Sequence, residues 1–340
     1  MGTSCMARIK IILISDAWIP QVNGVVTTYT NIIKHLPNNV SIDVIEPSQF
    51  FGFNFPFYKG IKLCVCTYNT MYDTLEKKTT LYKSQGYRVY YHIATEGPLG
   101  YQAKRVLDDC NMKYTTAYHT KFPEFFKAMY GIPIKLTKWY FSWFHSRSKY
   151  VMCSSESNVN ENKNWNSVVL DKGIDEIFVV KKKKYSTHKI LLYVGRVSKE
   201  KNIEDFCNLD ILNTTKIVVG DGPYRKTLEK KYDDVEFVGY KFGTELAEYY
   251  RNSDVLVFPS IVDTYGIVML EAMACGTPCA GYNVTGPIDQ IKNGINGYTD
   301  EDLELAVEMC LELDREVVYN TVKHKTWKNS SEQFVKYMTI

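Results

Sequence analysis

Two carboxylates eight positions apart occur in the segment PSIVDTYGIVMLE, residues 259–271. Asp263 precedes Gly266, and Glu271 lies in an apolar run typical of a helix. A turn residue and a helix cap would explain Asp263 and Gly266 in a purely structural connection, but they leave Glu271 unexplained. If a helix begins near Ile267, its first N–H groups can bind an anion. The two carboxylates can then accept hydrogen bonds from hydroxyls on either side of that anion.

A second motif carries two cations that can bind the same anion. The segment YVGRVSKEKNI, residues 193–203, ends a strand in Gly195 and Arg196 and has Lys201 five residues later, where a helix is expected. A guanidinium can bind a diphosphate bidentately, and an ammonium acts as a point charge. A diphosphate held between these cations, with hydroxyls bound to the two carboxylates described above, has the shape of a nucleotide sugar.

A third phosphate-facing position is Gly24, at the start of the helix predicted after the first strand. A residue without a side chain lets the backbone approach a phosphate at the positive end of a helix. The alternative is a plain loop with a helix cap formed by Asn23 and Gly24.

Several classes of protein are disfavoured by the sequence. The segment VGDGPYR, residues 219–225, lacks the third glycine of the dinucleotide fingerprint, so a nicotinamide or flavin oxidoreductase is not favoured. A net charge of +3 in 340 residues is too small to indicate nucleic acid as a partner. The nine cysteines are scattered through apolar runs, which favours reduced thiols in a cytoplasmic chain over disulfides or a zinc site. No apolar run reaches the roughly 18 residues of a spanning helix, so we expect at most a peripheral membrane contact.

Two sets of alternating strands and helices must position these residues. Near-continuous apolar strands separated by helices indicate parallel sheets covered on both faces. We therefore predict an α/β chain of two Rossmann-like, doubly wound domains facing each other across a cleft, with ligands beyond the carboxyl ends of the strands. The first set of strands is predicted over residues 8–15, 40–47, 61–66, 87–94, 113–118, 149–155 and 166–170. The second set is predicted over residues 188–195, 215–222, 235–240, 254–260, 277–281 and 296–300.

Domain boundaries follow from a change of pattern. A basic, turn-like segment at residues 180–187 interrupts the alternation, and a solvated linker is favoured there over a lipid or nucleic-acid patch. We predict one domain over residues 1–180 and a second domain over 181–322, which carries the motifs proposed to bind a nucleotide sugar.

Taken together, the ordered motifs resemble the retaining GT-B glycosyltransferases of family 4, also called glycosyltransferase group 1. The N-terminal motifs EGPLG and AYHTKFPE are similar to the branch that holds GDP-mannose-dependent α-mannosyltransferases and sulfoquinovosyltransferases. The resemblance implies that residues 1–180 form the acceptor-binding domain and residues 181–322 the nucleotide-sugar-binding domain. It also implies that residues 323–340 cross back to the N-terminal domain. It is carried by residues 16–26, 92–105, 115–125, 193–204, 218–229, 237–240, 259–281 and 293–298.

The resemblance implies a role for each site residue. Asp263 matches the first acid of the family's paired-acid motif, with Asp in place of Glu, so its reach toward the donor sugar is one methylene shorter. His119 matches a histidine near the reacting sugar; otherwise it is a structural histidine at a strand end. The residues implied in catalysis are His119, Arg196, Lys201 and Asp263. Those implied in donor binding are Gly24, Gly195, Arg196, Lys201, Val238, Gly239, Tyr240, Asp263, Tyr265, Gly266, Ile267, Val268 and Glu271.

The implied activity is that of a retaining hexosyltransferase, which moves mannose from GDP-mannose to a glycan or lipid acceptor. No Asp-x-Asp motif stands near the site, so we expect no metal, with cations and helix N-termini neutralising the diphosphate. Three alternatives stay open. They are transfer from a UDP-sugar (glucose, galactose or sulfoquinovose), a nucleotide-sugar epimerase or phosphorylase on the same fold, and a non-catalytic nucleotide-sugar-binding module.

The segment KLTKWYFSWFHSRSK, residues 135–149, mixes aromatic and basic residues. It suits a core-facing helix with a solvated basic edge. It also suits an interfacial helix that contacts anionic lipid at the cytoplasmic face of a membrane.

Overall fold

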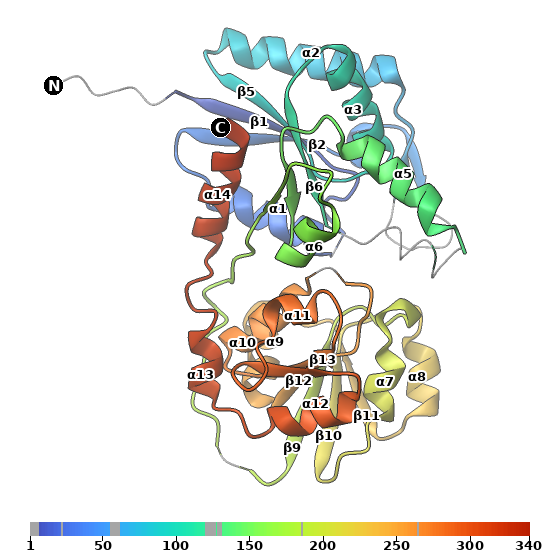
Figure 1. Ribbon diagram of the computed structural model, residues 1–340, viewed down its shortest axis with the longest axis vertical. Helices are drawn as coiled ribbons and strands as arrows, with labels where there is room; N and C mark the ends of the chain where they lie inside the picture. The colour runs from blue at the N-terminus through green and yellow to red at the C-terminus, as the bar shows by residue number, and fades with distance from the viewer. Residues whose placement is uncertain are drawn as a thin grey trace, which may run out of the picture. The chain divides into compact units, whose positions relative to one another are not determined.

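The computed structural model describes residues 7–21, 23–54, 62–119, 127, 131–184, 186–263 and 265–340. Its contacts divide the chain into two compact units (Figure 1). The N-terminal unit contains the described residues up to His119 together with residues 132–172 and 327–340. The C-terminal unit contains residues 173–326 and the described residues 127 and 131. Each unit is a doubly wound α/β structure around one parallel sheet, as the sequence predicts.

The N-terminal unit holds six parallel strands in the order β2-β1-β5-β6-β7-β8. Because the order reverses direction between β1 and β5, the switch point of this sheet lies between these two strands. The strands are β1 (Ile9–Ile14), β2 (Val40–Ile45), β5 (Arg88–Ile93), β6 (Tyr114–Tyr118), β7 (Val151–Cys153) and β8 (Ser167–Val169). The helices are α1 (Gly24–Lys34), α2 (Tyr68–Ser84), α3 (Pro98–Asp109), α5 (Ile134–His145), α6 (Glu156–Glu161) and α14 (Trp327–Thr339), with a short 3-10 turn at Pro47–Gln49.

Helices cover both faces of this sheet. From Ile11 to Ile14 the central strand β1 presents apolar side chains to each face in turn. Ile11 and Leu13 pack against α1 and α14 on one face, whereas Ile12 and Ile14 pack against α2, α3 and α5 on the other. All four side chains are fully buried. Such a strand, apolar on both faces, is typical of a parallel sheet between two helical layers.

One predicted strand does not join the main sheet. Lys62–Cys64 (β4) pairs antiparallel with Gly52–Asn54 (β3) in a separate two-stranded sheet, so the prediction of a main-sheet strand over 61–66 is wrong; residue 61 lies outside the described residues. Only residues 55–61 separate the two strands, too few for the crossover that parallel pairing requires.

The C-terminal unit also holds six parallel strands, in the order β11-β10-β9-β12-β13-β14, and its switch point lies between β9 and β12. The strands are β9 (Lys189–Val194), β10 (Thr214–Val219), β11 (Val235–Gly239), β12 (Val255–Phe258), β13 (Cys279–Tyr282) and β14 (Gly297–Asp300). The helices are η2 (Lys199–Lys201), α7 (Ile203–Asn208), α8 (Arg225–Lys231), α9 (Gly243–Asn252), α10 (Ile267–Ala274), α11 (Pro287–Gln290), α12 (Leu303–Cys310) and α13 (Arg315–Asn320).

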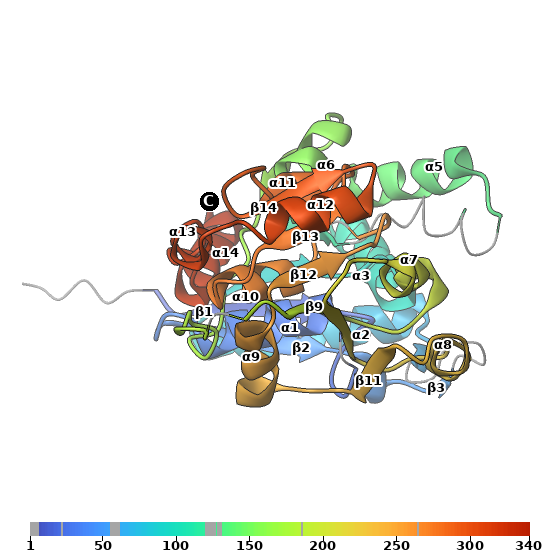
Figure 2. The same ribbon diagram turned by 90° about the horizontal axis from the view of Figure 1, so that it is seen from below.

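This second sheet is likewise covered on both faces. Leu192 and Leu256 pack with α9 and α10, whereas Leu191 and Val255 pack with α7, α8 and α12. Figure 2 shows α9 and α12 on opposite sides of the strands. The two layers leave the carboxyl ends of β9 and β12 as the edge at which a ligand is expected.

The boundaries between the units differ by a few residues from those predicted at 180 and 322. The chain passes to the C-terminal unit after Lys172, because Phe178 is buried in its core and Arg251 donates hydrogen bonds to the carbonyls of Ile177 and Val179. It returns at Trp327, the first residue of α14, whose Phe334 and Met338 are buried in the N-terminal core.

The described residues contain no helix that has both the length and the apolar character needed to span a bilayer. Eight cysteines fall within the described residues, and none of them forms a disulfide.

Candidate functional site

The loops that follow β9 and β12 bring a cation and a carboxylate together at the switch point of the C-terminal unit. Lys201, which ends η2, donates a hydrogen bond from Nζ to Oδ1 of Asp263. Each side chain keeps 26% of its surface exposed, so the pair faces solvent and can contact a ligand. The sequence places these residues 62 positions apart; the switch-point topology brings them together.

Two glycines hold the loop that carries Arg196. A Cβ on Gly220 would lie 1.9 Å from the carbonyl oxygen of Gly195, and a Cβ on Gly222 would lie 2.3 Å from that of Val197. At these two points the loop after β10 approaches the backbone of the loop after β9 too closely for any residue with a side chain. The Tyr193 hydroxyl also donates to the Arg196 carbonyl oxygen at 2.8 Å. Gly220 and Gly222, which do not complete a dinucleotide-binding motif, thus hold the loop that carries Arg196 in place.

The start of α10 is an open helix N-terminus. Gly266 is its cap residue, with φ of +77°, and no side chain caps its first turn among the described residues. The amide of Gln290 donates to the carbonyl oxygen of Tyr265 and lies 3.5 Å from that of Gly266, which fixes the loop before the helix. Ile267 and Val268 begin the helix and are half-buried, so their backbone amides can face an anion.

Glu271 lies one turn into α10 and is half-buried. The Tyr250 hydroxyl donates a hydrogen bond to its Oε2 at 2.8 Å. Burial raises the pKa of Glu271 to about 7, with a smaller contribution from the charge of Asp175, while the Tyr250 hydrogen bond opposes the rise. A carboxylate that titrates near neutral pH at the edge of an open helix end is a candidate binding group.

The loop after β11 presents two aromatic rings. Gly239 has φ of +75°, and its carbonyl oxygen accepts from the Gly220 N–H at 2.8 Å, so this turn is tied to the loop after β10. The rings of Tyr240 and Phe242 are stacked with centroids 6.0 Å apart, and they are 53% and 59% exposed. The side chain of Val238 is half-buried and packs against the core of the unit. Exposed aromatic faces of this kind can stack on a planar ring.

In the N-terminal unit, Gly24 is the first residue of α1 and is exposed. The side chain of Asn23 caps this helix by accepting from the N–H groups of Val25 and Val26, both at 3.0 Å. The helix cap weighed in the sequence analysis is therefore present, and those two amides are already hydrogen-bonded. A Cβ on Gly24 would meet no atom within 4 Å, so space for a ligand remains at its backbone.

His119 follows β6 and belongs to a chain of polar groups. Its Nε2 lies 3.1 Å from the Tyr29 hydroxyl, which is also 2.6 Å from Nε2 of His92. Burial lowers the pKa of His119 well below its ordinary value, and the nearby charge of Lys172 adds to the effect. Lys172 is 3% exposed, its Nζ has no hydrogen-bond partner among the described residues, and burial lowers its pKa to about 7. At neutral pH the imidazole of His119 is uncharged.

Two carboxyl groups at the switch point of the N-terminal sheet were not identified as candidate site residues from the sequence. Asp16, after β1, accepts from the N–H groups of Leu99 and Gly100 and so caps α3. Glu96, after β5, is 8% exposed, and burial raises its pKa to about 8. Its Oε1 lies 3.4 Å from Nε2 of His145, whose own pKa burial lowers to about 3. Only the strand order, which sequence periodicity does not give, puts these acids at the sheet's switch point.

The predicted site residues therefore fall into two sets. Gly24 and His119 lie in the N-terminal unit, and all the others lie at the carboxyl edge of the C-terminal sheet. Among the residues that the structure describes, no group of three or more His, Cys, Asp or Glu side chains is arranged to hold a metal ion.

Two doubly wound units with loops of this kind at a switch point define the GT-B fold. Residues 175–304 match the family model of glycosyl transferases group 1. Sucrose-phosphate synthase of Thermosynechococcus elongatus is similar in structure, with a TM-score of 0.72 and 19% identity over 97% of this chain and 98% of its own. HepE of Anabaena, solved in complex with UDP, has a TM-score of 0.71 and 14% identity over 96% and 99% of the two chains.

Curated relatives are similar in sequence. A GDP-mannose-dependent α-mannosyltransferase of Corynebacterium glutamicum is 24% identical over an alignment of 371 residues, which covers 96% of this chain and 88% of the relative. The sulfoquinovosyl transferase of Arabidopsis thaliana is 37% identical over 114 residues, which cover 32% of this chain and 22% of the relative.

Proposed function

We propose that the protein is a retaining hexosyltransferase that moves mannose from GDP-mannose to a glycan or lipid acceptor, without a metal ion. The observation that carries the proposal is the Lys201–Asp263 pair at the switch point of the C-terminal unit, within the residues that match glycosyl transferases group 1. The ammonium of Lys201, which would bind the diphosphate, thus contacts the carboxylate of Asp263, which would bind the donor sugar. The helix α10, with its open N-terminus, begins four residues after that carboxylate.

The chemistry requires charge stabilisation at the leaving group. When the bond between the sugar and the diphosphate breaks, negative charge grows on the diphosphate and positive charge on the anomeric carbon. Preorganised cations and helix N-termini stabilise such charge strongly, because they need no reorganisation during the reaction. In our proposal Arg196, Lys201 and the first amides of α10 neutralise the diphosphate, and this makes a divalent metal unnecessary.

The remaining residues would bind the other parts of the donor. Asp263 would accept hydrogen bonds from the sugar hydroxyls, and Glu271 from the ribose. Tyr240 would lie beside the base. From the N-terminal unit, Gly24 would contact the phosphates. The uncharged His119 would lie by the reacting sugar, where it can donate or accept a hydrogen bond without repelling a developing positive charge.

The choice of GDP-mannose is supported by the names of full-length relatives, at 24% identity. A UDP-sugar is the second candidate, because the solved structures of HepE include a complex with UDP-glucose. We expect the short side chain of Asp263 to discriminate between the two donors.

A thermal-shift panel tests the proposal directly. The full chain is melted with GDP-mannose, UDP-glucose, UDP-galactose and UDP-sulfoquinovose, since a ligand that binds the native state raises the melting temperature. We expect GDP-mannose to give the largest shift, and EDTA to leave the shift unchanged. A larger shift with a UDP-sugar would reject the mannosyl assignment, and the absence of any shift would reject donor binding.

Product analysis separates the remaining classes. Incubation of the donor with mixed acceptors should release GDP and form an α-mannoside. Epimerised donor, or phosphorolysis of an oligosaccharide, would indicate an epimerase or a phosphorylase. Tight donor binding with neither hydrolysis nor transfer would indicate a binding module.

We also propose a peripheral contact of α5 with anionic membrane. Phe141 and Phe144 of this helix are buried, whereas Leu136 and Trp139 are 61% and 69% exposed. Lysines at positions 135 and 138 stand beside this apolar pair and are exposed as well. Apolar and aromatic side chains flanked by lysine are typical of helices that lie at a membrane surface.

A further inference from the structure

A row of hydrogen-bonded side chains crosses the core of the N-terminal unit and ends at His119. The Tyr29 hydroxyl of α1 lies 3.1 Å from Nε2 of His119 and 2.6 Å from Nε2 of His92, on β5. Nδ1 of His92 lies 2.7 Å from Oγ1 of Thr115, on β6. The Thr115 hydroxyl donates to Sδ of Met338 at 2.9 Å. The polar row therefore begins on α14, the last helix of the chain.

The inner members of the polar row are held rigidly in the core. Tyr29, His92, Thr115 and Met338 are all buried. Phe334 of α14 packs edge to face against the ring of His92 and the ring of Tyr29, with centroids 5.1 and 6.0 Å apart. Because a close-packed interior leaves buried rings little freedom to turn, each ring presents the same atoms to its neighbours.

The two inner titratable groups of the polar row are uncharged at neutral pH. Burial raises the pKa of Tyr29 well above its ordinary value, so the hydroxyl keeps its proton. Burial lowers the pKa of His92 to about 3, and the nearby charge of Lys172 adds to the effect. The ring nitrogens of His92 face two hydroxyls, and an imidazolium buried without a carboxylate partner would be costly. His92 therefore carries a proton on only one of its two nitrogens.

The number of protons fixes the direction of each hydrogen bond in the polar row, because a hydroxyl has only one proton to donate. Thr115 gives its proton to Met338, so its oxygen accepts from the Nδ1–H of His92. Nε2 of His92 then has no proton and accepts from the Tyr29 hydroxyl. Since Tyr29 has no second proton, its oxygen accepts from the Nε2–H of His119.

We propose that the polar row, which runs from Met338 to Tyr29, fixes the tautomer of His119 with a proton on Nε2 and none on Nδ1. Tyr29, His92 and Thr115 are then positioning residues, because they act on a substrate only through His119. Met338 sets the direction of the whole row, because its sulfur takes the one proton that Thr115 can donate.

The tautomer decides which groups of a sugar can bind to Nδ1 of His119. This consequence rests on the proposed function, which places His119 by the reacting sugar. A ring nitrogen without a proton accepts a hydrogen bond and cannot donate one, so a sugar group that contacts Nδ1 must be a donor. A hydroxyl can donate, whereas an ionised sulfonate has no proton to give. Such a contact favours a hydroxyl over the sulfonate of sulfoquinovose.

Long-range proton–nitrogen NMR spectra of the full chain, with isotope-labelled histidines, show which ring nitrogen of each histidine carries the proton. Without any ligand and at neutral pH, we expect the proton on Nδ1 of His92 and on Nε2 of His119. The variants His92→Gln and His119→Gln each delete one set of signals and so assign the spectrum. A proton on Nε2 of His92, or on Nδ1 of His119, would overturn the inference.

Met338→Leu tests the far end of the polar row without a change next to His119. Leucine has a similar volume but accepts no hydrogen bond, so the Thr115 hydroxyl can turn and donate to Nδ1 of His92. Every hydrogen bond of the row can then reverse, and we expect the two ring-nitrogen signals of His119 to shift toward each other as two tautomers exchange. Met309→Leu changes an exposed methionine on α12 and should leave these signals unchanged. Wild-type signals of His119 in Met338→Leu would overturn the inference.

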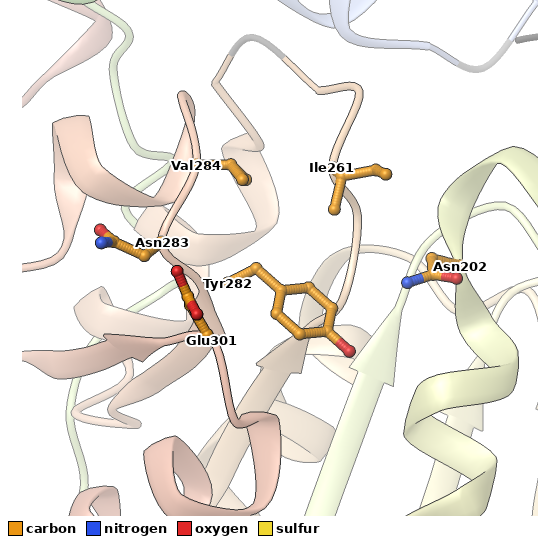
Figure 3. A pocket seen from close by; sticks show the side chains of 6 residues that line it. All are labelled: Asn202, Ile261, Tyr282, Asn283, Val284 and Glu301. Carbon is orange, nitrogen blue, oxygen red and sulfur yellow. The ribbon is translucent and has the colours of Figure 1, made fainter.

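Tyr29→Phe cuts the polar row beside His119 and should likewise mix the two tautomers. Tyr282→Phe is the matched control, because the Tyr282 hydroxyl donates to Oδ2 of Asp205 in the C-terminal unit. Its ring lines a pocket of about 340 Å³ in that unit (Figure 3), and its loss of a hydroxyl should leave the His119 signals unchanged. Equal His119 signals in Tyr29→Phe and the wild type would contradict the inference. Failure of the proposed function would appear differently, as His119 signals that do not move when GDP-mannose is added.

Discussion

Lys201 and Asp263, on loops that follow the two central strands of the C-terminal sheet, form an ion pair at the point where the strand order reverses. A ligand that binds there must meet both charges. A diphosphate is drawn to the ammonium, and a hydroxyl is drawn to the carboxylate. The pair therefore holds each partner in place before the ligand arrives, which lowers the cost of ordering the site.

Replacing Lys201 by Ala should lower kcat by about 100- to 1,000-fold, the usual loss when one charge-stabilising group is removed. The free energy of unfolding should change by no more than about 1 kcal/mol, because the ion pair is partly exposed. Lys199→Ala is the matched control, since Nζ of Lys199 lies over the Tyr224 ring, 5.2 Å from its centroid. Equal kcat values for Lys201→Ala and the wild type would reject the role of Lys201. Initial rates give kcat, and urea unfolding gives the free energy of unfolding.

Alanine at two glycines should separate a structural role from a binding role. Gly266→Ala puts a Cβ 2.7 Å from Cζ of Phe258 at a φ of +77°, so we expect a loss of stability. That loss should be about 1–3 kcal/mol, the cost of one strained residue. In Gly24→Ala the added Cβ contacts no atom, so stability should be unchanged. The KM for the donor should rise, because the backbone can no longer approach a phosphate. Thermal unfolding and donor saturation curves test both, and an unchanged KM for Gly24→Ala would contradict the phosphate contact.

Donor affinity should depend on pH through Glu271. Its pKa is raised to about 7, so the side chain is mostly ionised at pH 8 and mostly protonated at pH 6. Hydrogen bonds to an ionised acceptor are stronger, and we expect the dissociation constant of the donor to rise as the pH falls. The rise should disappear in Glu271→Gln, which is uncharged at both pH values. Calorimetric titrations at pH 6, 7 and 8 provide the comparison, and a parallel dependence in the variant would assign the effect to another group.

Glu96 should make stability fall as the pH rises. Its folded pKa of about 8 exceeds the ordinary value of 4.5, so between these values the native state binds more protons than the unfolded state. The free energy of unfolding should therefore drop with increasing pH, by up to about 1.4 kcal/mol per pH unit. Glu96→Gln removes the part of this slope that Glu96 contributes and should leave a smaller slope than the wild type has, because Glu271 with its raised pKa adds to it as well. Glu76→Gln, an exposed control on α2, should retain the wild-type slope. Urea unfolding at pH 5, 6.5 and 8 measures the slopes, and equal slopes for Glu96→Gln and the wild type would show that Glu96 is not the group responsible.

Binding to vesicles should require the exposed apolar pair of α5. We expect the wild type to co-sediment with vesicles of phosphatidylglycerol and phosphatidylcholine, and less so at high salt, because screening weakens the lysine contribution. The double variant Leu136→Ala, Trp139→Ala should bind about tenfold or more weakly, since each large apolar side chain contributes more than about 1 kcal/mol when buried. Leu81→Ala changes another exposed leucine, on α2, and serves as control. A wild type that stays in the supernatant would remove the membrane contact.

Much of the fold could be predicted because both sheets are parallel and buried. Strands such as β1 and β9 are near-continuous apolar runs. The rule that ligands bind at the carboxyl ends of strands pointed to the loops with Lys201 and Asp263. The β4 strand was misassigned because its apolar run looks the same whether it pairs parallel or antiparallel. Pairing depends on the length of the connection to β3.

The supports of the site could not be predicted, because each is a tertiary contact. Gln290 reaches the backbone of Tyr265 from 25 positions away, and Tyr250 reaches Glu271 from 21 positions away. Neither pair has a spacing that helix or strand periodicity would produce. The role of Gly220 was hidden for the same reason, since its neighbour Gly195 lies on another strand end.

Helix α14 has a consequence for how the protein is made. Phe334 and Met338 complete the core around Tyr29 and Ile11, although about three hundred residues separate them in the sequence. Domains generally fold in order as the ribosome releases them, N-terminal first. Here the first half of the chain emerges early but must wait, with part of its core uncovered, until residues beyond 326 have been translated. The nascent N-terminal unit is therefore a natural client for a chaperone during the whole synthesis of the C-terminal unit.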